Sequence, residues 1–156
     1  MQGEGHAVCL PEDIDTDLII AGRYLRTRDR SLWAAHVFED LDPALAARLK
    51  GAVIVAGKNF GCGSSREQAP IAIREAGVAA VIAPSFARIF FRNAVNIGLP
   101  LIESNLSCEE GNSVRFNVAE GWVESGGKRC GIRPLSPRMR EILAAGGLVE
   151  YWRGHQ

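Results

Sequence analysis

The sequence lacks three features that would each have indicated a class of protein. No apolar run approaches the roughly 20 residues needed to cross a bilayer. Neither sign of charge is in excess, because 18 lysines and arginines balance 18 aspartates and glutamates. The one basic cluster, at residues 23–30, is short and also contains Asp29. We therefore expect no membrane partner and no nucleic-acid partner. The opening residues also lack the basic-then-apolar pattern of a secretory signal, so a cytoplasmic location is expected.

Spacings typical of metal sites are absent as well. The four cysteines contain no Cys-x-x-Cys pair, which zinc ribbons and local iron–sulfur sites use. They stand at Cys9, Cys62, Cys108 and Cys130. Only three histidines are present, and they are scattered. We predict no metal and no cofactor in this chain, and we interpret the cysteines as small apolar residues of a reduced protein.

What the chain does contain is a regular alternation of strands and helices at its centre. Residues 52–56, 78–83 and 99–102 are apolar runs of strand length. Helices are predicted between them, at 64–76 and 86–95. Strand, helix and strand in this order form a βαβαβ unit, which crosses over right-handed into a parallel sheet.

Shorter elements flank this centre. The sequence predicts the following: a strand at 5–10, helices at 31–39 and 43–50, a strand pair at 113–118 and 121–124, and a helix at 137–145. Ser31 is the expected N-cap of the first of these helices, and Ser136 that of the last. No repeat or linker is visible, so we expect a single domain over residues 1–156.

The glycine-rich loop at residues 57–70 carries the chemical information. Its three glycines, which include Gly63, allow tight turns and a close approach to a ligand. Ser64, Ser65 and Arg66 follow, where the strand passes into a helix. Free N–H groups and the positive dipole end at a helix start favour an anion. An arginine binds a carboxylate through two parallel hydrogen bonds, so the loop predicts a carboxylate or phosphate site.

Several known anion-binding loops do not match these residues. In a P-loop the lysine follows the glycines, whereas Lys58 precedes the last two here. A dinucleotide loop would need glycine at position 66, and a cysteine phosphatase loop would need five residues between Cys62 and Arg66 instead of three. One alternative stays open: Ser64 and Ser65 could cap the helix, with Glu67 or Gln68 completing a capping box. Pro70 disfavours this cap, because it would forfeit a bond in the first turn.

The stretch from Asn59 to Glu67 resembles the signature of the swivelling domain of the aconitase superfamily. Residues 85–90 and 93–99 resemble its second signature, and the turn at 15–17 and the segment 142–148 are also similar. The length is similar to that of stand-alone small subunits, as in 3-isopropylmalate dehydratases and homoaconitases. The resemblance implies an α/β fold: a swivelling β/β/α domain with a central parallel βαβαβ sheet and added hairpin strands.

The resemblance also implies roles for individual residues. Ser64 matches the serine that, as an alkoxide, removes a proton from carbon. Ser65, Arg66 and the backbone at Gly63 match ligands of the substrate carboxylate. Asp17 matches an active-site carboxylate, with helix capping as its structural alternative. The leaving hydroxide is taken by a 4Fe–4S cluster that belongs to a large partner subunit.

One position departs from the resemblance. Gln68 stands where the family usually has histidine, and glutamine does not titrate near neutral pH, so the resemblance carries no acid–base role to this position.

The substrate depends on the loop at residues 24–27. Arg26 in this loop suits the extra carboxylate of a homocitrate-type substrate, or it is an exposed arginine with no such role. Leucine biosynthesis is the commoner role of such subunits, so 3-isopropylmalate dehydratase is the first prediction and homoaconitase the second. A non-catalytic module that binds a small diacid is the alternative of another class.

Overall fold

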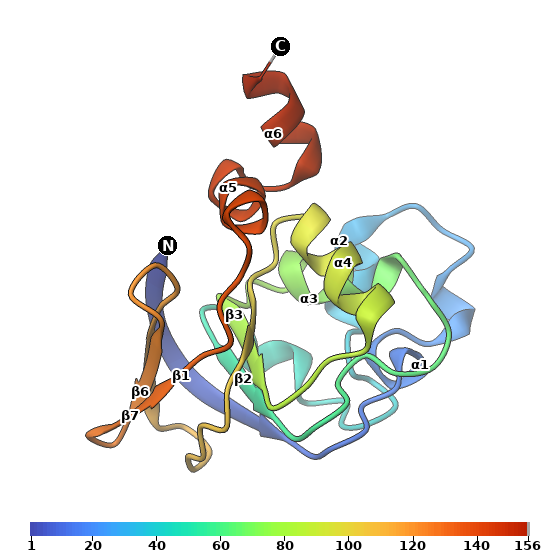
Figure 1. Ribbon diagram of the computed structural model, residues 1–156. Helices are drawn as coiled ribbons and strands as arrows, with labels where there is room; N and C mark the ends of the chain where they lie inside the picture. Colours follow the sequence, from blue (N-terminus) through green and yellow to red (C-terminus); the bar gives the residue numbers. More distant parts are fainter. Residues whose placement is uncertain (156) are drawn as a thin grey trace.

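The computed structural model describes residues 1–155, which form a seven-stranded sheet packed against helices (Figure 1). The strand order is β4-β3-β2-β1-β5-β6-β7. The strands are β1 (Gln2–Leu10), β2 (Val53–Ala56), β3 (Ala80–Ala83), β4 (Leu101–Glu103), β5 (Ser113–Asn117), β6 (Trp122–Ser125) and β7 (Lys128–Gly131). Strands β1 to β4 are parallel, and β5 to β7 continue the sheet antiparallel. The predicted parallel βαβαβ unit with added hairpin strands is thus confirmed.

Strand β1 belongs to both halves of the sheet. Its second half pairs in parallel with β2, where Ala7 lies opposite Val53. Its first half pairs antiparallel with β5, where His6 lies opposite Ser113. The antiparallel half is therefore joined to the parallel half through this one strand.

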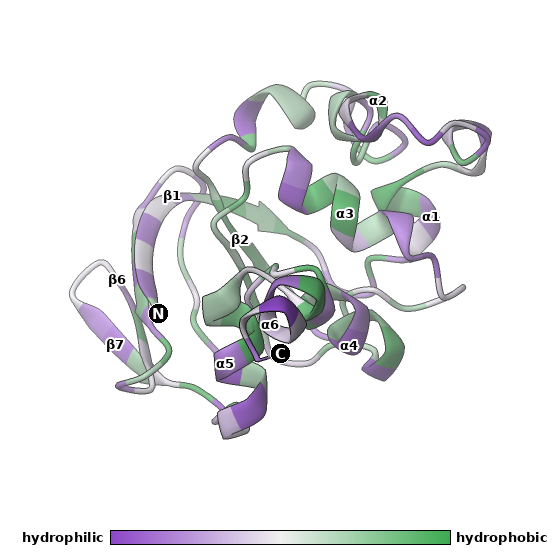
Figure 2. Ribbon diagram, turned by 90° about the horizontal axis from the view of Figure 1, so that it is seen from above, coloured by the Kyte–Doolittle hydropathy of each residue, from purple (hydrophilic) through white to green (hydrophobic). Residues whose placement is uncertain are grey.

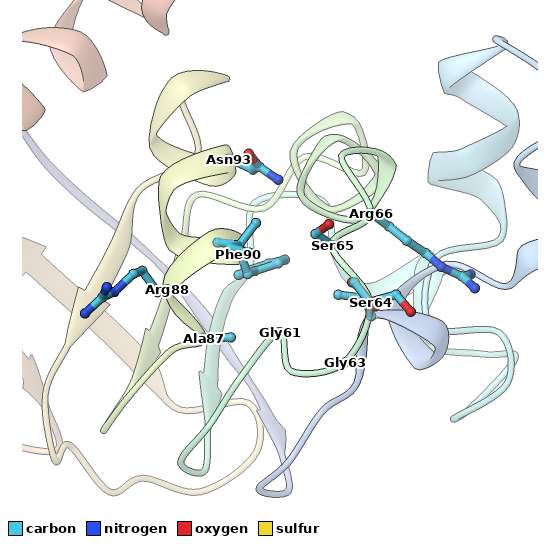
Figure 3. Close-up of a pocket in the computed structure, with 11 residues that line it drawn as sticks. Gly61, Gly63, Ser64, Ser65, Arg66, Ala87, Arg88, Phe90 and Asn93 are labelled. Atoms are coloured by element: carbon cyan, nitrogen blue, oxygen red, sulfur yellow. The ribbon is translucent and has the colours of Figure 1, made fainter.

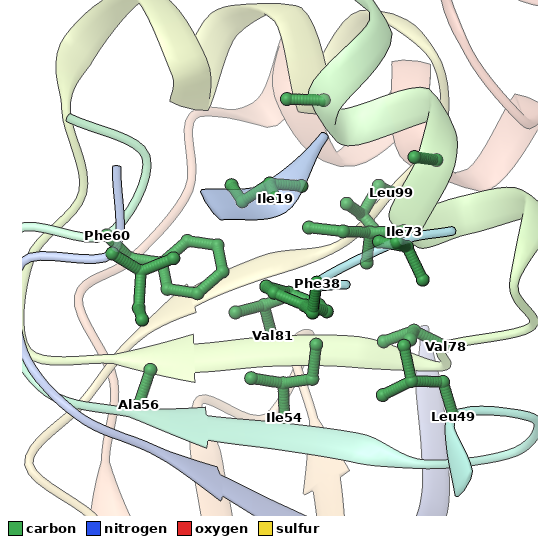
Figure 4. Close-up of a cluster of buried hydrophobic side chains, with 14 of the residues drawn as sticks. Ile19, Phe38, Leu49, Ile54, Ala56, Phe60, Ile73, Val78, Val81 and Leu99 are labelled. Carbon is green, nitrogen blue, oxygen red and sulfur yellow. The ribbon is translucent and has the colours of Figure 1, made fainter. Parts of the chain in front are cut away.

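Two hydrophobic cores lie on opposite faces of the parallel strands. Side chains alternate across a strand, so Ile54 of β2 and Val81 of β3 face the helices, while Val53 faces the other way. The helix-side core also contains Phe60, Phe38 and Ile73 (Figure 4). The second core lies against the antiparallel strands and includes Val114, Phe116 and Val123. The antiparallel half of the sheet thus packs against the face of the parallel half that is opposite the helices. The result is two β layers and one α layer, in agreement with the predicted β/β/α domain.

The helices cover one face of the sheet and continue beyond it. They are α1 (Thr16–Ile19), α2 (Arg30–Ala35), α3 (Gln68–Glu75), α4 (Arg88–Asn96), α5 (Pro137–Ala145) and α6 (Leu148–Gly154), with 3-10 turns at Gly22–Tyr24 and Ala46–Arg48. Figure 2 shows hydrophobic residues on β2 and α3 in the middle of the molecule and hydrophilic ones on β7 and on the loop before α2. Helix α6 projects from the body at the end of the chain (Figure 1). Among residues 1–155, no helix has the length and apolar character needed to span a bilayer.

Several predicted elements differ from the structure. The helix expected at 43–50 is replaced by turns and a 3-10 turn, although Asp42 does accept a hydrogen bond from the Ala44 amide. The N-cap of α2 is Asp29, which also binds Ser31, instead of Ser31 itself. Strand β7 and helix α6 were not predicted. Ser136 does cap α5, through a 3.2 Å bond from the Met139 amide, as expected.

Candidate active site

The glycine-rich loop leaves the carboxyl end of β2 and runs between two other loops. The Gly61 amide donates to Ile14 O at 2.8 Å, and the Thr16 amide donates to Cys62 O at 2.9 Å. On its other side, Phe60 forms a bridge to Phe86, just before α4. The loop is therefore held on both sides by backbone hydrogen bonds. Ligand sites of parallel sheets lie at this end of the strands.

Two glycines are required by close approaches of neighbouring side chains. Gly61 has φ +84°, and a Cβ added there would lie 2.6 Å from Cδ1 of the Phe90 ring. Gly63 has φ +87°, and a Cβ there would overlap the carboxylate of Asp15. Both features, a left-handed backbone and an absent side chain, are what only glycine supplies. They fix the path of the chain directly before the two serines.

Thr16 holds the backbone of Ser64 in place. Its side chain is almost fully buried, and its hydroxyl donates to Ser64 O at 2.7 Å. Asp15, the N-cap of α1, accepts a hydrogen bond from the Asp17 amide at 2.8 Å. The acidic turn and the glycine-rich loop therefore form one rigid unit.

This unit forms one wall of a cavity of about 290 Å³, and the start of α4 forms the other (Figure 3). Gly63, Ser64, Ser65 and Arg66 line the first wall. Ala87, Arg88, Ile89, Phe90 and Asn93 line the second, and Thr16 and Gly61 complete the lining. The hydroxyls of Ser64 and Ser65 have no hydrogen-bond partner among the described residues, and both serines are exposed. Their hydroxyls are thus available to a ligand.

The anion-binding groups expected from the sequence are also present beside the cavity. Within residues 1–155, no acceptor binds the amides of Ser65, Glu67 and Gln68, which lead into the start of α3. Arg66 donates to Ile20 O at 3.0 Å and pairs with Asp17 at 2.7 Å. Its guanidinium points toward α1 (Figure 3), so it is oriented by the protein before any ligand binds. Free amides and an oriented arginine are suited to holding a carboxylate.

The structural alternatives for these residues fail. Helix α3 begins at Gln68, and its N-cap, Glu67, makes no side-chain cap. Ser64 and Ser65 therefore do not cap a helix, and the regular helix starts four residues later than the predicted position 64. The later start keeps Pro70 within the first turn, where a proline costs no hydrogen bond. Asp17 does not cap α1 either, since Asp15 does.

The predicted site residues are not all in one place. Gly63, Ser64, Ser65 and Arg66 line the cavity, and Asp17 joins them through its ion pair with Arg66. Arg26 is exposed and does not line the cavity. Its segment nevertheless starts next to Arg66, because a Cβ on Gly22 would lie 3.7 Å from the Arg66 guanidinium.

Sequence reasoning did not single out Thr16, Arg88 or Asn93 as site residues. Arg88 and Asn93 belong to the second signature, which already pointed to this segment. The burial of Thr16 had no local signal.

The base of the Arg26 segment is fixed by a polar cluster around Glu39. The Tyr24 hydroxyl donates to Glu39 at 2.5 Å, and Arg23 pairs with Glu39 and Asp40, each at 2.7 Å. His36 also contacts Glu39, and its ring stacks on that of Tyr24. The hydrogen bond from Tyr24, followed by those from Arg23 and His36, lowers the pKa of Glu39 to about 2. Residues 23 and 24 are thus held firmly, two positions before Arg26.

The four cysteines are free thiols, and each is partly buried. Among the described residues, no three His, Cys, Asp or Glu side chains converge as metal ligands. Burial, assisted by Asp15 and Asp13, raises the pKa of Cys62. Burial, with Cys108 and Glu110, raises the pKa of Cys9 to about 11. Both thiols are therefore protonated at neutral pH.

Comparison with known proteins gives consistent results. A family model described as the aconitase C-terminal domain matches residues 13–105. A protein of Moorella thermoacetica named 3-isopropylmalate dehydratase small subunit is 51% identical, with 97% of this chain and 93% of that protein covered. The methanogen homoaconitase small subunit of Methanothermobacter thermautotrophicus is 48% identical, with 90% and 85% covered. The crystal structure of a 3-isopropylmalate dehydratase from Methanocaldococcus jannaschii superposes with a TM-score of 0.95, at 45% identity and with 99% of this chain and 95% of that chain covered.

Proposed function

The chain belongs to the aconitase C-terminal domain family, and on this premise we propose that it is the small subunit of 3-isopropylmalate dehydratase. The family predicted from the two signatures is confirmed. The proposed reaction isomerises 2-isopropylmalate to 3-isopropylmalate by loss and return of water, as part of leucine biosynthesis. The observation that carries the proposal is the pair of unpartnered serine hydroxyls in a cavity beside Arg66 and free amides.

Ser64 is proposed as the base of the dehydration step. Its oxygen takes the proton from the carbon next to the departing hydroxyl, and the electron pair of that C–H bond forms the C=C bond. Rehydration returns the proton and places the hydroxyl on the neighbouring carbon. A serine alkoxide needs positive charge and oriented N–H donors, which Arg66 and the loop amides supply. The rigid contact with Thr16 keeps Ser64 at a constant distance from the bound diacid.

Arg66, Ser65 and the backbone at Gly63 are proposed to hold one carboxylate of the diacid. Asp17 orients the guanidinium of Arg66 through their 2.7 Å ion pair. Because the pair leaves the second guanidinium nitrogen bound only to a backbone carbonyl, Arg66 has N–H groups left for a substrate. Gln68 lies at the start of α3 and is proposed to have no proton-transfer role.

The second half of the site is proposed to come from a large subunit that carries a 4Fe–4S cluster. When bound there, the cluster supplies a Lewis acid for the departing hydroxide. The name "small subunit" of the relatives supports a hetero-oligomer. A cytoplasmic location is part of the proposal and rests on the sequence alone.

Homoaconitase small subunit is the second candidate, because Arg26 would suit a third carboxylate and a homoaconitase subunit is 48% identical. The non-catalytic binding module is not favoured, because the relatives are named as enzyme subunits.

The decisive experiment is reconstitution with the cognate, cluster-loaded large subunit. Ser64→Ala is expected to lower kcat by about 10²–10⁴-fold with little change in KM, because a general base acts on the chemical step. Ser107→Ala, an exposed serine outside the cavity, is the control. A Ser64→Ala enzyme as active as this control would refute the assignment of the base.

The substrate is tested on the same reconstituted enzyme. Turnover of isopropylmalate and of homoaconitate is compared for wild type, Arg26→Val and Arg28→Val, an exposed arginine of the same loop. Homoaconitase activity that is lost only in Arg26→Val would favour the second candidate. Turnover of isopropylmalate alone, in all three proteins, supports the first.

A further inference from the structure

A second hollow, of about 580 Å³, lies next to the candidate active site, between α4 and the segment before α5. We call it the arginine groove. Its floor contains Phe86, Phe91 and Met139, and its rim contains Arg88, Arg92 and Arg133. Arg88 lines both the groove and the active-site cavity. In Figure 3 its side chain extends away from the serines. The groove is therefore a continuation of the surface on which the active site opens.

Two of the three arginines of the groove have no ion-pair partner within residues 1–155. Arg133 pairs with Glu103 at 3.3 Å. Arg88 and Arg92 are exposed, and no described residue forms an ion pair with either. They stand four residues apart on α4, on the same side of the helix, where two like charges repel each other. A negative group lying against the pair would remove this repulsion.

The floor of the groove indicates what kind of anion this is. Phe86 and Phe91 pack edge to face at 5.8 Å and are only partly buried. Ile89, which points from the same first turn of α4 into the active-site cavity, is 51% exposed. A free small anion gains nothing from aromatic and aliphatic neighbours. A polypeptide that offers acidic and apolar side chains together would cover the floor and neutralise the rim.

We infer that the arginine groove is the surface on which the large subunit docks, through a segment with carboxylates opposite Arg88 and Arg92 and apolar side chains over Phe86 and Phe91. This inference rests on the proposed function, because it needs the large subunit. Docking here would place the partner beside the cavity that holds Ser64, because Arg88 lines both hollows. It would also account for the unbalanced arginines, which are then part of an interface.

The test uses the full chain and the cluster-loaded large subunit, with affinity measured by anaerobic calorimetry and activity measured on the assembled enzyme. Arg92→Glu reverses one rim charge outside the active-site cavity, and Lys128→Glu reverses a charge at the start of β7, away from the groove. The Kd for the large subunit is expected to rise at least about tenfold in Arg92→Glu. It should stay near the wild-type value in Lys128→Glu. Arg92→Gln should fall between, because it removes the charge without reversing it.

Further readouts separate docking from other roles of the groove. At saturating large subunit, kcat and KM of Arg92→Glu should equal those of wild type. Raising the salt concentration should weaken wild-type assembly more than assembly of Arg92→Glu. Thermal unfolding at the wild-type temperature would show that the variant is folded.

Three results would overturn the inference. If Arg92→Glu bound the large subunit as tightly as Lys128→Glu does, the groove would be excluded as the docking surface. The proposed function would be unaffected. A raised KM with unchanged Kd would show that the groove holds a small anion. A wild-type chain that neither binds a large subunit nor supports hydration would refute both the proposed function and the docking surface.

Discussion

Gly63→Ala tests whether the close contact between the glycine-rich loop and the acidic turn sets the geometry of the active site. Two effects add. An alanine at φ +87° is strained by about 1–2 kcal/mol. Its Cβ also overlaps the Asp15 carboxylate, and displacing that carboxylate removes the N-cap of α1, worth about 1 kcal/mol. We expect the free energy of unfolding to fall by about 2–3 kcal/mol, or roughly 4–12 °C in Tm.

The matched control is Gly121→Ala, in the turn between β5 and β6. Gly121 has φ +82°, nearly the same as Gly63, but a Cβ there would meet nothing within 4 Å. It should show the strain alone, about 1–2 kcal/mol. The difference between the two variants isolates the contact with Asp15.

Activity gives the sharper distinction between the two variants. In Gly63→Ala the backbone next to Ser64 must move, and a displacement of about 1 Å at a reacting group costs on the order of 10²-fold in rate. Gly121→Ala should retain wild-type kcat at a temperature where both proteins are folded. Thermal unfolding and hydration kinetics of the reconstituted enzyme measure the two effects. Equal kcat values for the two variants would refute the idea that this contact positions Ser64.

Two further predictions follow from the titratable groups. The pKa of Glu39, about 2, lies below its unfolded value of about 4.3, so its stabilisation is present above pH 4.3 and is lost as the pH falls toward 2. Glu39→Gln should therefore lose less Tm than wild type between pH 5 and pH 3, and equal losses would show that the cluster is not coupled to folding. The pKa of Cys9 is about 11, so little reactive thiolate is present at pH 8. Iodoacetamide should therefore label Cys9 more slowly in the native chain than in the urea-unfolded chain, as measured by mass spectrometry. Equal labelling rates would contradict the burial of Cys9.

The parallel half of the fold could be predicted because its strands have a distinct sequence pattern. Residues buried on both faces must be apolar, so β2 and β3 are continuous apolar runs. Strand β7 has no such signal, because it is an edge strand whose residues are mostly exposed. Helix α6 has only seven residues and one buried side chain, Tyr151, so its stability comes from tertiary packing that a local pattern does not contain.

The candidate site also contains one part that the sequence predicts and one part that it does not. The serines, Arg66 and Gly63 share one continuous loop, so their proximity was readable from the sequence. The ion pair of Arg66 with Asp17 and the bond from Thr16 to Ser64 join segments more than 45 positions apart. Such contacts depend on how the loops pack. For the same reason, Arg88 was noticed only as part of a similar segment.

The shared strand β1 has a consequence for how the chain folds. Strand β1 must wait for a partner strand more than 100 positions later in the chain, because Gln2 pairs with Asn117. The parallel half can assemble from residues 7–103 while the tail is still being made, and the antiparallel half can close only after synthesis has passed β5. Long-range closure of this kind is slow, so we expect the last kinetic phase of refolding to report on the core around Val114 and Val123. Deleting the first five residues should detach that layer while leaving the parallel strands paired.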